Sequence, residues 1–145
     1  MDELTELLRP SWGSEKWILE GWEQITPKEK QLIQSRVDEL FQNGLPFEVK
    51  QDKLLYIYAF SLLAQLEVLA IQVPLKFEGK MLSINHKKRM RLQLLDEIFH
   101  GIVFTKILYM LCAPYAYPPP YNNNIEVICN FIRSEECPKT AVCTA

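Results

Sequence analysis

The stretch that decides the fold is Leu62-Leu63-Ala64-Gln65-Leu66-Glu67-Val68-Leu69-Ala70-Ile71, near the middle of the chain. It is apolar almost all round, which indicates a helix in the centre of a bundle rather than on its surface. Glu67 is the exception. An ionised carboxylate among such neighbours costs several kcal/mol unless it is paired, protonated or bound to a metal. We therefore expect Glu67 to face a partner from another helix.

A second unusual group follows in Asp96-Glu97-Ile98-Phe99-His100, which also lies between apolar residues. Residues three apart share one face of a helix, so the side chains of Glu97 and His100 can reach the same point. A carboxylate oxygen together with an imidazole nitrogen suits iron or manganese. The pair therefore predicts half of a metal site, although a Glu-x-x-His spacing also arises without a metal.

Both segments belong to a predicted helical hairpin. Its first helix covers residues 48–73, where Pro74 ends or kinks it, and its second covers residues 84–112 after the N-cap Ser83. The bend near Ser83 is about equally far along the chain from Glu67 and from the Glu-x-x-His pair. In an antiparallel hairpin such residues lie side by side, so the sequence predicts that the three side chains meet at one level.

The whole chain is predicted to be all-α, a single helical domain or a fragment of one. Its expected parts are N-terminal helices in residues 1–45, the hairpin in 48–112, a connector rich in proline, tyrosine and asparagine in 113–124, and C-terminal helices in 125–145. The segment Thr26-Pro27-Lys28-Glu29 predicts a helix start with a capping box. The last residues resemble the first turns of a helix, so we expect the N-terminal part of a longer bundle.

Composition narrows the possible functions. The chain has 145 residues, 48% hydrophobic and 23% charged, which is typical of a globular domain. A net charge of −2 gives no electrostatic reason to expect nucleic acid, and the basic run over residues 86–91 is interpreted as a solvated helix end. The acidic, polar first residues do not fit a signal peptide, which predicts the cytoplasm. Polar residues within 54–73 favour a core helix over a membrane span.

The cysteines, aromatic residues and histidines suggest no other site. The four cysteines fit no zinc-ligand spacing and are expected to be reduced, partly buried thiols. Trp12, Trp17 and Trp22, like the tyrosines, are predicted to pack in the core. With only 2 histidines, a His-rich zinc site is excluded, and neither histidine has a recognisable nucleophile context.

The two ligand-bearing segments resemble a known family. A helix that carries Glu, followed by a helix that carries Glu-x-x-His, is similar to the first half of the ferritin-like di-iron carboxylate proteins. The segment 96–100 resembles in particular the (Asp/Glu)-Glu-x-x-His of di-iron oxygenases such as the p-aminobenzoate N-oxygenase type and the acyl-carrier-protein desaturases. The resemblance implies that Glu67 is a terminal ligand of one iron, Glu97 bridges both irons and His100 binds the first. Asp96 is not a ligand in this motif and is expected to support a ligand or to lie on the surface.

The resemblance also implies cofactors and substrates. A di-iron centre, or a manganese–iron pair, would use O₂ to oxidise a small organic substrate. Apolar neighbours such as Leu63, Leu66, Phe99 and Phe104 predict an apolar substrate pocket. Neither nucleic acid nor a membrane is expected as a partner.

The sequence departs from the family pattern because it holds no second Glu-x-x-His. Three explanations stay open: a missing C-terminal half, a homodimer in which a second copy completes the site, or no metal chemistry. The first is the favoured expectation, and the chain alone is not expected to be active as a monomer.

A competing hypothesis is a non-catalytic helical module that binds a protein. In that case Glu67, Glu97 and His100 form an ordinary polar contact in the core. The tryptophan-rich N-terminus or the tyrosine- and proline-rich connector would then provide the binding surface.

Overall fold

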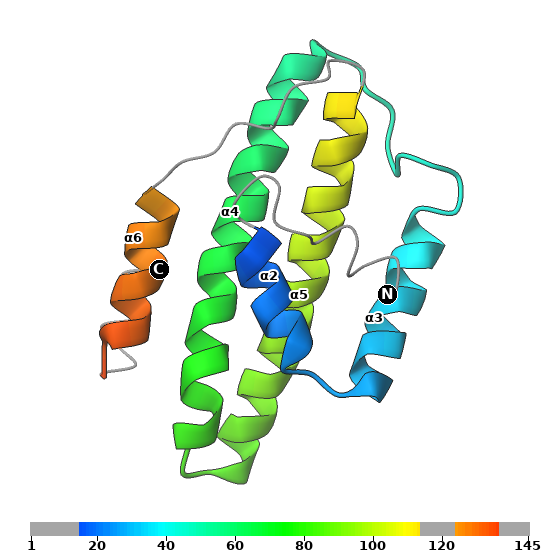
Figure 1. Ribbon diagram of the computed structural model, residues 1–145. Coiled ribbons are helices and arrows are strands. Elements are labelled where there is room, and N and C mark those ends of the chain that lie inside the picture. The colour runs from blue at the N-terminus through cyan, green and yellow to red at the C-terminus, as the bar shows by residue number, and fades with distance from the viewer. Residues whose placement is uncertain (1–14, 114–123, 137–145) are drawn as a thin grey trace.

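The computed structural model describes residues 15–113 and 124–136, and the chain is helical throughout most of these ranges (Figure 1). The helices are α2 (Glu15–Glu23), α3 (Pro27–Leu40), α4 (Lys53–Phe77), the 3₁₀ helix η1 (Glu78–Lys80), α5 (Ile84–Cys112) and α6 (Asn124–Ser134). No strand occurs within the two described ranges, so the all-α prediction is confirmed for them. The first part of the predicted N-terminal helices (residues 1–14, with Trp12), the connector after Ala113 up to residue 123, and residues 137–145 with Cys137 and Cys143 lie outside the described residues.

The centre of the fold is the antiparallel hairpin of α4 and α5, joined through η1 (Figure 1). α2 lies across one side of this hairpin and contacts both of its helices. α3 packs beside α5, and α6 packs beside α4. The described helices therefore form a bundle built around the two predicted ligand-bearing helices.

Two predicted boundaries of the first hairpin helix are wrong. The helix does not start at Glu48 but at Lys53, because the Asp52 side chain accepts a hydrogen bond from the backbone N–H of Leu54 and caps the first turn. It also continues through Pro74 to Phe77. A proline removes one backbone donor, and here the next turn closes regardless, with the N–H of Glu78 donating to the carbonyl of Pro74.

The predicted helix caps are confirmed. The Thr26 hydroxyl accepts a hydrogen bond from the backbone N–H of Glu29 at 3.1 Å, and the Glu29 carboxylate accepts one from the N–H of Thr26 at 2.9 Å. Ser83 caps α5 by accepting from the N–H of Asn85. Beyond α3, Gly44 adopts a φ of 87°, a left-handed conformation that glycine reaches without strain.

The core between α2 and the hairpin is closely packed. A Cβ atom at Gly21 would lie 3.1 Å from Cγ2 of Ile71, so this glycine lets α2 approach α4. Trp17 and Trp22 are buried, as predicted for packing residues. Cys112 and Cys129 are free and buried, in line with the predicted buried thiols, and burial raises the pKa of the Cys129 thiol to about 12.

The helix α4 has several large apolar side chains that stay exposed among the described residues. Within the described residues it is the helix whose length and composition would allow it to cross a membrane, with a mean hydropathy of 1.9 over its most apolar window and 39% of that window buried. The core helix of a soluble bundle has the same properties. Two buried polar side chains of α4 have partners inside the protein, since Gln65 donates to the Ser61 carbonyl and the side-chain carbonyl oxygen of Gln72 accepts from Arg133.

Candidate metal centre

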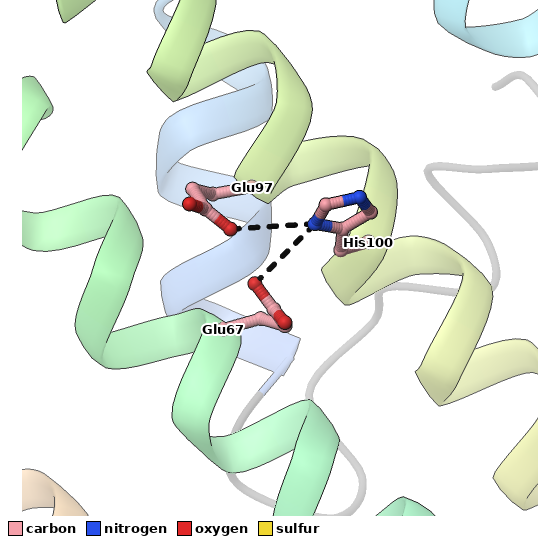
Figure 2. Close-up of side chains that lie close together, drawn as sticks. All are labelled: Glu67, Glu97 and His100. Atoms are coloured by element: carbon pink, nitrogen blue, oxygen red, sulfur yellow. Dashed lines mark hydrogen bonds and ion pairs between the residues drawn. The ribbon is translucent and has the colours of Figure 1, made fainter.

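The hairpin brings together the three residues that the sequence singled out. One ligand atom each from Glu67, Glu97 and His100 lie within 4.8 Å of one another (Figure 2). Nδ1 of His100 is 3.4 Å from Oε2 of Glu97 and 3.7 Å from Oε2 of Glu67. The three side chains thus point toward a common position between α4 and α5.

The cluster lies at the surface of the hairpin rather than in the middle of the bundle. The Glu67 and Glu97 side chains are 17% and 20% exposed, whereas the His100 side chain is 46% exposed. The carboxylates are therefore largely removed from water, and the imidazole is open on one side.

Close packing at Gly101 of α5 sets the height along the hairpin at which the cluster lies. Gly101 follows His100, and a Cβ at this position would lie 3.3 Å from Ile18 of α2 and 3.8 Å from Cβ of Glu67. The missing side chain therefore allows α2 and α4 to approach at the height of the ligands. On the other side, the Phe104 ring stacks on His100 with centroids 6.2 Å apart and limits the positions of the imidazole.

The role of Gly101 is absent from the sequence-based site prediction. A glycine inside a helix destabilises the helix by about 1 kcal/mol relative to alanine. A glycine directly after His100 is therefore the sequence signal that indicates close helix packing at this position. Phe104, in contrast, had been predicted as an apolar neighbour of the ligands, and the structure places it there.

The two carboxylates of the cluster have too little positive charge nearby to compensate their own charge. Burial, and then the neighbouring carboxylate of Glu97, raise the pKa of Glu67 to about 8. Among the described residues, the ion pairs of Glu67 and Glu97 are those with His100. Glu67 is therefore protonated more readily than an exposed glutamate. A divalent cation would supply the positive charge that the two carboxylates lack.

The donor set and its spacing fit a transition metal. Ligand atoms bound at about 2.0–2.2 Å to one ion lie roughly 3.0–3.4 Å apart in octahedral or tetrahedral geometry. The separations of 3.4 and 3.7 Å between Nδ1 of His100 and the two carboxylates are close to that range. Two carboxylate oxygens and one imidazole nitrogen suit iron or manganese.

Asp96 lies apart from the three ligand atoms. Its side chain is 61% exposed and sits 3.7 Å from the Arg36 guanidinium of α3. Arg36 in turn lies over the Phe99 ring at 4.0 Å. Asp96 therefore lies on the surface and contacts α3, which is one of the two alternatives expected from the sequence.

A surface hollow of about 540 Å³ lies between Phe99 and the end of α3. Arg36, Glu39 and Asn43 are among its lining residues, and none of the three ligands lines it. This hollow is more polar than the predicted substrate pocket and does not reach the candidate ligands, so the apolar substrate pocket stays a prediction.

Comparison of the chain with protein-family models, with curated proteins and with solved structures finds no match. The resemblance to di-iron proteins therefore depends on the local motif and on the geometry of the three side chains.

Proposed function

We propose that this chain is a metal-binding helical protein of the ferritin-like di-iron type, acting as an oxidase or oxygenase on a small organic substrate. The observation that carries the proposal is the convergence of two part-buried carboxylates and one imidazole on adjacent antiparallel helices. In four-helix di-iron proteins, ligands of these types at this spacing project into the bundle from facing helices.

Each residue has a defined task in the proposal. Glu67 would hold the cation from α4, and Glu97 would hold it from α5. His100 supplies the nitrogen ligand, and Phe104 orients its ring. Bound iron would supply the chemistry of O₂-dependent oxidation. The low exposure of the two carboxylates limits the access of water to the cation.

The test is the iron content after anaerobic loading with Fe(II) and removal of free metal. The wild-type protein is expected to retain iron, and Glu97→Gln and His100→Ala are expected to lose it. The matched controls are Glu39→Gln, which changes an exposed glutamate on α3, and His86→Ala, which changes the other histidine at the exposed start of α5.

The outcomes separate metal binding from an ordinary polar core contact. Equal iron retention in wild type and all four variants would mean adventitious binding and would exclude this site. No iron in a folded wild-type protein would favour the alternative, a non-catalytic helical interaction module, which the exposed leucines of α4 would suit.

A further inference from the structure

The candidate centre is half of a ligand set. The described residues offer two carboxylates and one imidazole at the cluster. Di-metal centres in four-helix bundles use four carboxylates and two imidazoles, from two helices with a Glu and two with Glu-x-x-His. The α4–α5 hairpin carries one helix of each kind, so two hairpins together carry the complete set.

Among the described residues, α2 covers one side of the hairpin (Figure 1) and no helix covers the opposite side at the level of the ligands (Figure 2). A Cβ at Gly101 would lie 3.3 Å from the Ile18 side chain of α2. In Figure 2 the view is from the opposite side, and α2 lies behind the three ligands. The ligands are thus presented away from α2.

Apolar side chains border the ligands on this open side. Leu55, Leu62 and Leu66 of α4 are exposed and recur at spacings of seven and four, so they form one stripe along the helix. Leu63, one turn before Glu67, is also exposed. A contiguous group of exposed apolar side chains is typical of an interaction surface.

We propose that the occupant of this face is a second copy of the chain, related by a two-fold axis, and that the two copies share one di-metal centre. The proposal rests on the proposed function, because it assigns the missing ligands of that same site. A two-fold interface places the same patch on both partners, so a partner with the leucine stripe also brings its own Glu67, Glu97 and His100. An unrelated apolar partner would cover the leucines but would leave the metal with only three protein ligands.

In this arrangement, dimer formation and metal binding are thermodynamically coupled. Without a cation, two copies would bury four carboxylates close together without a compensating positive charge, which opposes association. With two divalent cations the centre is close to neutral. Metal therefore promotes the dimer, and the dimer completes the coordination of the metal.

The first experiment is native mass spectrometry of the 145-residue chain across an anaerobic Fe(II) titration, with oligomeric state checked by analytical ultracentrifugation. The expected result is a shift from the 17.0 kDa monomer to a species of twice that mass which carries two iron ions. A monomer that binds iron through Glu97 and His100 at every protein concentration would overturn the shared site and leave the proposed function standing. A protein that binds no iron, whether monomer or dimer, would overturn both.

The second experiment changes the interface without changing a ligand. Leu62→Arg and Leu66→Arg replace side chains that are 57% and 44% exposed, so the fold of each monomer is expected to survive, as circular dichroism would verify. Both variants are expected to stay monomeric and to lose at least tenfold in iron affinity although all three ligands remain. The control is Leu32→Arg, an equally exposed leucine on α3, which is expected to behave as wild type. Undiminished iron binding in a monomeric Leu62→Arg protein would contradict the proposal.

Discussion

Two carboxylate clusters on the same hairpin have opposite electrostatics. At the first, the Arg91 guanidinium of α5 binds Glu29 of α3 through two hydrogen bonds of 2.6 and 2.9 Å and reaches Glu78 at 3.3 Å. At the second, about two turns along α5, Glu97 faces Glu67 with His100 beside them. The Arg91 hydrogen bonds lower the pKa of Glu29 to about 2, whereas burial and Glu97 raise the pKa of Glu67 to about 8.

The difference separates a structural cluster from a candidate functional one. Glu29 has its cation within the chain and holds α3 against α5, so its charge is already compensated. Among the described residues, Glu67 and Glu97 form no ion pair with a lysine or arginine, which leaves a proton or an external cation to compensate their charge. Buried carboxylates without a compensating cationic side chain are typical of metal sites and active sites.

The largest effect is expected from removing the cation of the structural cluster. Arg91→Met leaves Glu29 and Glu78 unpaired and part-buried, so the free energy of unfolding should fall by about 2 kcal/mol. Urea unfolding measures it, with Arg89→Met, at an exposed position in the same turn, as the control with little change. If both variants lose the same stability, the Arg91 cluster does not hold α3 to the hairpin.

A smaller effect is expected from acid. The pKa of Glu29 is lowered from 4.5 to about 2, so its contribution is present above pH 4.5 and is lost as the pH falls toward 2. Solvent screening reduces the contribution to on the order of 1 kcal/mol. Unfolding measured between pH 5 and pH 2 should show a shallower loss in Glu29→Gln than in wild type, with Glu39→Gln as control. The same slope in all three proteins would show that Glu29 does not titrate as a paired group.

The smallest effect on stability, and of opposite sign, is expected at the candidate metal centre. Glu97→Gln keeps the shape of the side chain and removes a like charge beside Glu67, so the metal-free protein should gain roughly 0.5 kcal/mol. The same variant is expected to lose bound iron. Thermal unfolding with and without Fe(II) measures both results. A loss of stability in the metal-free variant would mean that Glu97 is a structural partner of Glu67 and His100.

Much of the fold could be predicted from the sequence because local signals define it. The capping box at Thr26, the cap at Ser83 and the all-round apolar run before Pro74 each act over a few residues. The passage of α4 through Pro74 could not be predicted. A proline costs one hydrogen bond locally, and packing of the following turn against the core, where Phe77 is fully buried, offsets that cost.

The sequence by itself determined which residues are candidates for the metal centre and that they meet, because helical periodicity and an equal distance from one bend place them at the same level. Only the tertiary structure decided how exposed they are, which side of the hairpin α2 covers, and which carboxylate receives an arginine. Those properties depend on contacts between residues far apart in the sequence, such as Ile18 with Gly101 and Glu29 with Arg91. Such contacts leave no periodic pattern in the chain, since each follows from how whole helices pack.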